Sequence, residues 1–280
     1  MGLTHGLGSA LLEVRGANLY YKVRGTGPVL LIIQGGAGDA DGADRLADGL
    51  VDAFTVVTYD RRGLSRSLLT DTTKATTVET HSEDALHLLT GVTAEPALVF
   101  GGSLGGVIAL DLVARHPDQV RTLVAHEPAS PELLSEAERN EALLTHAKLD
   151  ETFRREGVAA AMRKTLAVSA ATFDDRETDL ELPKRDAQAM ARLAGNMTFF
   201  LTYDAGAAHR YKPDIAALRH APTRIVPAAG QTSGESWPRH SAMALAAQLG
   251  TDLQEFPGNH SGSMFRPRAF AKRLREVLER

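Results

Sequence analysis

A serine flanked by glycines is the pattern in this chain that points most directly to chemistry. Gly101-Gly102-Ser103-Leu104-Gly105 fits the spacing G-x-S-x-G, which places a nucleophilic serine on a sharp turn between a strand and a helix. The apolar residues 97–100 predict a buried strand before it, and residues 104–115 predict a helix after it. Glycines two positions before and after the serine leave space where a Cβ is poorly tolerated. The pattern therefore predicts an exposed, nucleophilic Ser103 hydroxyl.

A serine hydroxyl is a poor nucleophile until a base removes its proton, so a histidine must come from elsewhere in the chain. Of the ten histidines, His260 lies in the loop 256–262, between the last predicted strand and the final predicted helix. The His126-Glu127 pair precedes Pro128, which stops the helix that a zinc-binding H-E-x-x-H motif requires, so we expect no metal. The remaining histidines are expected on solvated helices or peripheral loops: His5, His81, His87, His116, His146, His209, His220 and His240.

Short apolar segments that alternate with amphipathic ones predict the scaffold that positions these residues. Strands are predicted at residues 11–15, 19–24, 29–33, 54–59, 97–100, 120–125, 223–228 and 252–256. Helices are predicted at residues 43–51, 78–89, 104–115, 238–249 and 267–280. This alternation indicates a parallel sheet wrapped by helices.

One long segment interrupts the alternation. It contains no convincing strand, and helices are predicted at residues 132–146, 151–169 and 184–203. An all-helical block between two strands of one sheet is expected to be an inserted cap, or lid. The predicted domains are a core of residues 1–128 and 212–280 and a cap of residues 129–211.

The composition excludes several classes of function. The chain has 280 residues with 31 Lys and Arg against 35 Asp and Glu, a net charge of −4, so it lacks the basic character of a nucleic-acid binder. It has no cysteine, which excludes disulfides, thiolate metal sites and a cysteine nucleophile. No basic residue precedes an apolar stretch at the N-terminus, and the longest aliphatic run, 29–33, is too short to span a membrane. We therefore expect a cytoplasmic protein that binds neither nucleic acid nor membrane.

These motifs together resemble the α/β-hydrolase superfamily, and the resemblance covers nearly all of the chain. Residues 34–38, Gln-Gly-Gly-Ala-Gly, are similar to its oxyanion loop after the third strand, with Gln34 where a histidine is more usual. Residues 59–67 are similar to its turn after the fourth strand, with Ser65 where a glycine is common. The resemblance implies a mostly parallel eight-stranded sheet flanked by helices, with a helical cap between strands six and seven. It also implies that His260 is the catalytic histidine, in agreement with the order of serine and histidine along the chain.

The glycines at positions 35–38 have a chemical reason. An oxyanion hole needs backbone N–H groups aimed at the developing negative charge, and bulky side chains would obstruct the approach. The geometry of the motif predicts that Gly36 and Leu104 supply these N–H groups. The glycine spacing does not fit G-x-G-x-x-G, and the sequence contains no phosphate-binding G-x-x-x-x-G-K-[ST] loop, so we expect no cofactor.

The acid that should orient the histidine has two candidates. The superfamily most often carries it after the seventh strand, where this chain reads Gly230-Gln231-Thr232-Ser233-Gly234-Glu235, with Ser233 in the usual place of the aspartate. Glu235 lies close by, although the start of a helix also explains an acidic residue there. Some members carry the acid after the sixth strand, where this chain has Glu127. We favour Glu127, with Glu235 as the alternative, and the possibility that neither serves remains open.

The cap and the loops near the end of the chain carry apolar residues that could line a substrate pocket. The candidate pocket residues are Gln34, Gly35, Met162, Met197, Phe200, Trp237 and Met264. For any one helical residue of this set, a place in the core of the cap is the simpler interpretation. The surplus of Met and Phe in the cap nevertheless favours a hydrophobic substrate.

The sequence predicts a serine hydrolase that acts on a carboxylic ester or lactone of a small hydrophobic molecule. Ser103 would form the acyl-enzyme, with His260 as the base and Glu127 as the orienting acid. The same residues would serve a C–C bond hydrolase, a lyase or a cofactor-independent, haloperoxidase-like perhydrolase. A non-catalytic small-molecule receptor on this scaffold is a further alternative. Either a monomer or a homodimer is compatible with the sequence.

Overall fold

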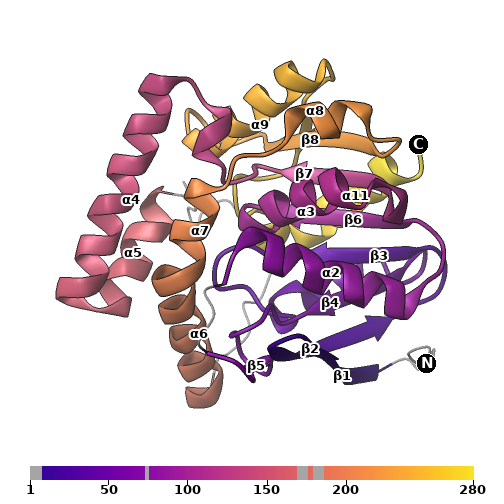
Figure 1. Cartoon of the computed structure of the whole chain (residues 1–280), viewed down its shortest axis with the longest axis horizontal. Helices are drawn as coiled ribbons and strands as arrows, with labels where there is room; N and C mark the ends of the chain where they lie inside the picture. Colours follow the sequence, from indigo (N-terminus) through magenta and orange to yellow (C-terminus); the bar gives the residue numbers. More distant parts are fainter. Residues whose placement is uncertain (1–7, 73–75, 169–175, 179–185) are drawn as a thin grey trace.

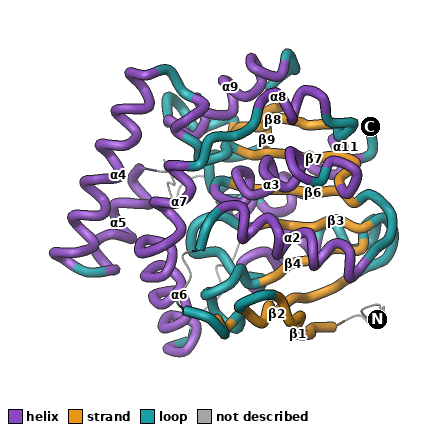
Figure 2. The backbone as a smooth tube through the Cα atoms, in the orientation of Figure 1, coloured by secondary structure: helices purple, strands orange, loops and turns teal. Residues whose placement is uncertain are grey.

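The computed structural model describes residues 8–72, 76–168, 176–178 and 186–280. A central sheet has helices on both of its faces, and a further group of helices lies beyond one end of the strands (Figures 1 and 2). The carboxyl ends of the parallel strands therefore face these additional helices, while the C-terminus of the chain lies at the other end of the sheet (Figure 1).

One sheet contains all the strands of the described chain. They are β1 (Gly8–Val14), β2 (Ala17–Arg24), β3 (Val29–Ile33), β4 (Thr55–Tyr59), β5 (Leu68–Leu69), β6 (Ala97–Gly102), β7 (Val120–His126), β8 (Arg224–Gly230) and β9 (Gln254–Phe256). Their order is β1-β2-β4-β3-β6-β7-β8-β9, with β5 beside β2. Neighbours from β4 through β9 run parallel, whereas β1, β2 and β5 pair in antiparallel fashion. The mostly parallel sheet is confirmed. The predicted count of eight omits β5, because two residues are too few to show an apolar pattern.

Burial of the central strands on both faces explains their continuous apolar runs. Along β3, Leu31 and Ile33 join the apolar core on one face, and Leu30 and Ile32 join the core on the other. Consecutive side chains of a strand point to opposite faces, so both sets must be apolar where helices cover both sides. The edge strand β1 lacks this cover, and Leu11 on it is 62% exposed.

Seven helices of the described chain accompany the sheet. They are α1 (Asp44–Asp48), α2 (Val78–Val92), α3 (Leu104–Arg115), α8 (Ile215–His220), α9 (Trp237–Leu249), α10 (Gly262–Phe265) and α11 (Pro267–Leu278). The core on one face contains residues of α2, α3, α8 and α9, and the core on the other face contains residues of α1 and α11. The fold class predicted from the alternation of strands and helices is therefore correct. The short helices α8 and α10 were not predicted.

The described residues between β7 and β8 form helices and no strand. The elements there are α4 (Glu136–Glu156), α5 (Val158–Val168), α6 (Ala187–Phe199), a π-helical turn (Phe200–Asp204) and α7 (Ala205–Arg210). Met197 and Leu201 pack with Leu149 and Ala161 in a small core of their own. That core also contains Ala37 from the loop after β3, so these helices rest on the carboxyl edge of the sheet. The domain division at residues 128/129 and 211/212 stays a prediction.

The first helix of this segment differs from its prediction. The expected interruption between residues 146 and 151 is absent, and α4 runs without a break from Glu136 to Glu156. Ser135 and Glu138 form a capping box at its start, and Gly157, with a φ of 83°, ends it. Residues 147–150 contain no helix breaker, whereas Gly157 adopts a positive φ that residues with a side chain rarely take. The predicted end at Ser169 and the predicted start at Lys184 lie outside the described residues.

Within the described residues, none of the helices combines the length and the apolar character needed to cross a bilayer.

The tight approach of α3 to β3 gives a test of the fold. A Cβ added to Gly105 would overlap the carbonyl oxygen of Ile33, which belongs to a central strand and has little freedom to move. Gly105→Ala should therefore lower the free energy of unfolding by roughly 3 kcal/mol. Gly195→Ala is the matched control, because nothing lies within 4 Å of the added Cβ on α6. It should be neutral or stabilise the protein by up to ~1 kcal/mol. Urea denaturation measures both changes, and equal stability of the two variants would contradict the packing described here.

Candidate active site

Ser103 stands between β6 and α3 in a strained backbone conformation. Its φ of 54° and ψ of −121° are unusual for a residue with a side chain. A Cβ on Gly101 would overlap the backbone of Gly105, so these two glycines allow the chain to turn sharply at the serine. The Ser103 N–H donates to the carbonyl oxygen of His126 at 2.9 Å, and its own carbonyl accepts from Ala129 N–H at 3.2 Å. Ser103 is half-buried. The predicted strand–turn–helix geometry is present.

Glu127 lies beside the serine at the end of the neighbouring strand. Gly102 of β6 pairs with His126 of β7, so the residues that follow them, Ser103 and Glu127, leave the sheet side by side. Glu127 also has a positive φ, 44°, and its N–H donates to the carbonyl of Ala228 at 2.8 Å. Its side chain is fully buried. Among the described residues, Ser65, Ser103 and Glu127 are the non-glycine residues with positive φ, and two of these three are predicted site residues.

His260 reaches Glu127 from the loop after β9. A Cβ on Gly230 would lie 2.5 Å from the carbonyl oxygen of Gly258 and 2.7 Å from the carbonyl carbon of Asn259, so this loop packs closely on the end of β8. Gly262 N–H closes the loop by donating to Asn259 O at 2.8 Å. His260 Nδ1 lies 2.7 Å from Glu127 Oε2. The bond occupies Nδ1 and leaves Nε2 as the ring nitrogen available for a further partner.

The second oxygen of the Glu127 carboxylate is also satisfied. Oε1 accepts from the backbone N–H of Gly230 at 2.9 Å and from the hydroxyl of Ser233. Burial alone would raise the pKa of Glu127, but the hydrogen bond and positive charge of His260, with help from His126 and Ser233, lower it to about 2. The carboxylate is therefore ionised at neutral pH although it is buried.

Ser233 explains the departure from the superfamily pattern noted in the sequence. It occupies the position where an aspartate is more usual, and its hydroxyl donates to the glutamate that comes from the neighbouring strand. The side chain is buried with 2% of its surface exposed. Sequence reasoning missed this partner, because a lone serine in a turn carries no signal of the residue it faces.

The alternative acid, Glu235, is not in contact with His260. Its side chain is 94% exposed and lies 3.1 Å from His240 Nε2, the residue five positions later on α9. An exposed acid just before the N-terminus of a helix is the ordinary surface arrangement. The structure thus brings Glu127 rather than Glu235 to the histidine.

The glycine loop, defined here as residues Gln34–Gly38, packs against the serine. A Cβ on Gly35 would lie 2.7 Å from Ser103 Cβ, so the loop backbone touches the nucleophile residue. Gly38 N–H donates to Gly35 O at 2.9 Å and closes a turn in which Gly36 has a φ of 50°. The Gly35 carbonyl and the Gly36 N–H belong to one peptide plane and point in opposite directions. Because the carbonyl faces into the turn, the Gly36 N–H faces out of it.

Leu104 begins α3 directly after Ser103, and the backbone N–H groups of a first helical turn have no partner inside the helix. The point that a Cβ on Gly35 would occupy lies 3.3 Å from Leu104 N. The two predicted oxyanion donors, Gly36 and Leu104, therefore belong to segments that are packed against each other beside Ser103.

Three of the predicted pocket residues pack in the core of the additional helices, whereas Met264 and Trp237 lie outside that core. Met162, Met197 and Phe200 pack in the small core of the additional helices, next to Ala37. Met264 is 48% exposed, and the indole of Trp237 packs edge-on against the rings of His146 and His209.

Gln34, in the position of the more usual histidine, lies along its own loop. Its Cβ lies 2.9 Å from the position of a Cβ on Gly38, and its Nε2 lies 3.8 Å from that of a Cβ on Gly42. The Gln34 side chain therefore follows the loop, while its neighbour Gly35 contacts the nucleophile residue.

The prediction of solvated histidines is wrong for His81 and His209, and burial also lowers the pKa of His146 to about 4. His81 is 2% exposed, with its Nε2 3.1 Å from Asp204, and His209 is 8% exposed against His146. Burial, with a smaller contribution from the charges of His146 and Arg210, lowers the pKa of His209 to about 2. Both histidines lie on helix faces that turn toward other helices, and the sequence period did not distinguish these faces from solvated ones. His5 lies outside the described residues.

His126 is also buried, and burial lowers its pKa to about 4. No group of three or more His, Cys, Asp or Glu side chains suited to a metal ion occurs in the part of the chain that the structure describes.

Comparison with known proteins identifies the family. A family model described as the alpha/beta hydrolase fold matches residues 28–200. The uncharacterized hydrolase YraK of Bacillus subtilis is 41% identical over 278 residues, which is 98% of this chain and 97% of that protein. The chain belongs to the alpha/beta hydrolase family. This membership confirms the resemblance predicted from the motifs and makes the protein a hydrolase.

More distant relatives of this alpha/beta hydrolase include enzymes with named substrates. A zearalenone hydrolase of Cladophialophora bantiana is 31% identical over 133 residues, 46% of this chain and 50% of that protein. The crystal structure of the enol-lactonase from Burkholderia xenovorans LB400 superposes with a TM-score of 0.73 at 20% identity, over 97% of this chain and 100% of that one. At such identity the likeness establishes the shared fold.

The two candidate acids are separated by substitution. Glu127→Gln keeps the shape of the side chain but removes the charge that faces His260, and it should lower kcat for an aryl ester by about 10⁴, as for triad acids elsewhere. Glu235→Gln is the matched control, because its exposed carboxylate contacts only His240 among these residues, and it should leave kcat unchanged. Steady-state kinetics measures both. A small and equal loss in the two variants would refute the assignment of Glu127.

Glu127 should also make stability depend on pH. Its pKa of about 2 lies below the ordinary value of 4.5, so the ionised form stabilises the folded state. This contribution is complete above about pH 5 and is lost as the pH falls through the interval from 4.5 toward 2. The difference in free energy of unfolding between wild type and Glu127→Gln should therefore shrink over that interval in urea denaturation. A difference that stays constant would mean that the carboxylate is not preferentially ionised in the fold.

Proposed function

We propose that this hydrolase cleaves a carboxylic ester or lactone of a small hydrophobic molecule through an acyl-enzyme on Ser103. The observation that carries the proposal is the 2.7 Å contact between His260 Nδ1 and a buried, ionised Glu127, directly beside a serine in a strained strand-to-helix turn. A histidine held by a carboxylate next to a serine is the arrangement that makes a hydroxyl nucleophilic.

In the proposed first step, Ser103 Oγ attacks the carbonyl carbon of the substrate. His260 Nε2 takes the serine proton, and Glu127 keeps the ring in the tautomer with hydrogen on Nδ1 and stabilises the imidazolium that forms. Ser233 and the Gly230 N–H hold the carboxylate, so it does not rotate away from the ring.

The carbonyl oxygen becomes negatively charged as the tetrahedral intermediate forms. The N–H groups of Gly36 and Leu104 would donate to it, and each such donor contributes roughly 3 kcal/mol to the stabilisation of the transition state. Collapse of the intermediate breaks the C–O bond of the ester, and the leaving alkoxide takes the proton from His260. In a lactone the released alcohol stays attached to the acyl group. Water then attacks the acyl-enzyme, with His260 again as the base, and releases the carboxylic acid and free Ser103.

The apolar core of the additional helices supports a hydrophobic substrate. Met162, Met197 and Phe200 pack in that core against Ala37, which directly follows the proposed oxyanion donor Gly36. An apolar acyl or ring group bound next to the carbonyl would lie at the edge of this core. The relatives named for a lactonase and a zearalenone hydrolase favour esters and lactones over the C–C bond cleavage and perhydrolysis that the same residues could support.

Active-site labelling tests the proposed nucleophile. A fluorophosphonate probe should label the wild-type protein at Ser103 and fail to label Ser103→Ala, and the same variant should lose hydrolysis of aryl esters and lactones by at least about 10⁴. A parallel assay on β-diketones distinguishes C–C bond hydrolysis. Equal labelling of wild type and Ser103→Ala, or turnover of β-diketones without turnover of any ester or lactone, would contradict the proposal.

A further inference from the structure

The backbone carbonyls of the glycine loop are held by hydrogen bonds. Three successive carbonyl oxygens, those of Gly35, Gly36 and Ala37, each accept a hydrogen bond. The first bond is internal to the loop, from Gly38 N–H at 2.9 Å. The other two come from side chains that depend on the helices between β7 and β8, and these helices are called the cap below.

The carbonyl of Gly36 accepts from the guanidinium of Arg61, which follows β4. Arg61 is fully buried, and its other terminal nitrogen, Nη1, lies 2.6 Å from Asp204 Oδ2 in the π-helical turn of the cap. Asp204 is buried too and accepts from His81 Nε2 at 3.1 Å. A buried arginine needs a buried acid to compensate its charge, so the cap supplies the group that keeps Arg61 in place under the loop.

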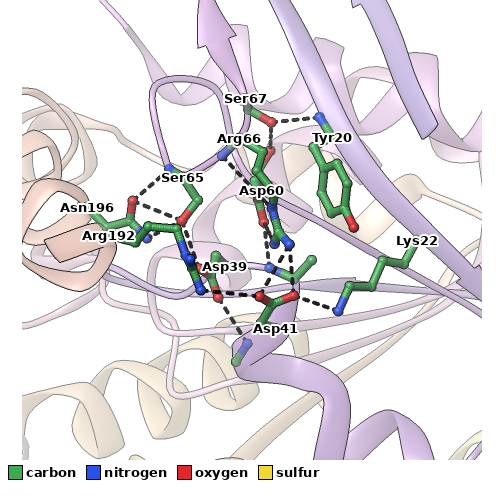
Figure 3. Close-up of polar contacts among 12 residues, drawn as sticks. Tyr20, Lys22, Asp39, Asp41, Asp60, Ser65, Arg66, Ser67, Arg192 and Asn196 are labelled. Atoms are coloured by element: carbon green, nitrogen blue, oxygen red, sulfur yellow. Dashed lines mark hydrogen bonds and ion pairs between the residues drawn. The ribbon is translucent and has the colours of Figure 1, made fainter. Parts of the chain in front are cut away.

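The carbonyl of Ala37 accepts directly from a cap side chain. Asn196 of α6 donates from Nδ2 to Ala37 O at 3.2 Å. Its Oδ1 accepts from the N–H of Ser65 at 2.7 Å, and its Nδ2 also lies 2.9 Å from Ser65 Oγ (Figure 3). Ser65, with a φ of 47°, stands where the superfamily commonly has a glycine, and both Asn196 and Asp39, whose Oδ2 accepts from Ser65 Oγ at 2.7 Å, hold it there.

Residues 40 and 41, which follow the loop, are held by groups on and next to the sheet, with one long ion pair from the cap, Arg192 Nη2 to Asp41 Oδ2 at 3.8 Å. Asp60 accepts from Ala40 N–H at 2.8 Å, and Asp60 itself is held by Arg66 at 2.7 Å. Arg66 in turn pairs with Asp41 and lies over the ring of Tyr20 (Figure 3). The turn at residues 35–38 is thus the part of the segment whose geometry depends on cap residues.

The orientation of one N–H group connects these contacts to catalysis. A glycine peptide rotates at little steric cost, so the direction of the Gly36 N–H is set by whatever fixes the carbonyls on either side of it. Release of the carbonyls of Gly36 and Ala37 would let the turn relax and move this donor away from the reacting oxygen. A displacement of about 1 Å at a catalytic group can cost 10²-fold in rate.

We propose that Asn196 and the Asp204–Arg61 pair are positioning residues that fix the oxyanion-binding N–H of Gly36, so that the cap completes the catalytic geometry as well as covering the substrate. This inference rests on the proposed function, because it gives the Gly36 N–H its role. It predicts that loss of these contacts impairs stabilisation of the tetrahedral intermediate more than binding of the ground-state substrate.

The test uses Asn196→Asp in the full-length protein. The substituted side chain keeps an oxygen to accept from Ser65 N–H but no longer donates to Ala37. Arg192→Gln is the matched control, since Arg192 lies one turn earlier on α6 and reaches Asp41 at 3.8 Å, outside the turn. Asp204→Asn weakens the hold on Arg61 and so tests the contact to the carbonyl of Gly36. It also replaces Asn196→Asp as the test variant if circular dichroism shows that Asn196→Asp does not fold.

The measurements are kcat and KM for an aryl ester and the inhibition constant of an aryl trifluoromethyl ketone. Ser103 Oγ adds to the carbonyl carbon of this ketone, His260 takes the proton, and the resulting oxyanion occupies the same place as that of the reaction. Asn196→Asp should lower kcat by about 10- to 100-fold and change KM by less than about threefold. It should raise the inhibition constant of the ketone by the same factor by which it lowers kcat/KM. Arg192→Gln should match the wild type in all three values.

A purely structural role of Asn196 would lower the melting temperature and leave both kcat and ketone affinity at wild-type values below the transition, and that result would overturn the inference. An equal loss in Arg192→Gln would overturn it as well, since the effect would then belong to the helix and not to the carbonyl contact. A wild-type protein that neither hydrolyses the ester nor binds the ketone would instead refute the proposed function.

Discussion

The carboxylate of Glu127 is charged in a place that water does not reach, and the surrounding elements are arranged to satisfy that charge. β7 delivers the residue to the rim of the sheet, β8 supplies the Gly230 N–H, the turn after β8 supplies the Ser233 hydroxyl, and the loop after β9 supplies the ring of His260. Removal of any of these partners leaves a buried charge with too few hydrogen bonds, which is far more costly than the loss of a surface contact. The three last strands are therefore tied together at the point where the chemistry is proposed to occur.

On the side of Ser103 and the glycine loop, the site is held by close backbone packing and by hydrogen bonds to backbone carbonyls. The turn that carries Ser103 and the glycine loop contact each other so closely that Gly35 and Gly105 have no room for a side chain. A segment stripped of side chains cannot hold its own shape by packing, so neighbouring residues must hold its carbonyls. The buried Arg61 and the amide of Asn196 do so, and Asp204 in turn holds Arg61. Asn196 and Asp204 belong to helices far along the chain from the loop. The cap is in this respect part of the structural support of the sheet edge.

Much of this arrangement was predictable from the sequence, for identifiable reasons. The parallel strands were visible because both of their faces are buried, and Ser103 was visible because its turn demands glycines at fixed positions. Glu127 was predicted from its place at the end of a buried strand, and the structure brings it to His260.

What escaped prediction depends on tertiary contacts that leave no local pattern. Ser233, Asn196 and His81 are polar residues in ordinary sequence surroundings, and each becomes significant only through a partner that comes from a distant part of the chain. The break between the first two cap helices lies at Gly157, where α4 ends, and not between residues 146 and 151. Continuous helix formers between residues 146 and 151 offered no reason for a break there.

The position of the hydrogen on the neutral His260 ring decides whether this histidine can act as the base. Nitrogen-15 spectra of the imidazole, assigned by comparison with His260→Gln and recorded at a pH where the ring is neutral, distinguish the protonated from the unprotonated ring nitrogen. The contact with Glu127 should keep the hydrogen on Nδ1 and leave a bare Nε2 able to accept the Ser103 proton. A neutral ring with hydrogen on Nε2 could not accept the serine proton there, and that result would rule out His260 as the base held by Glu127.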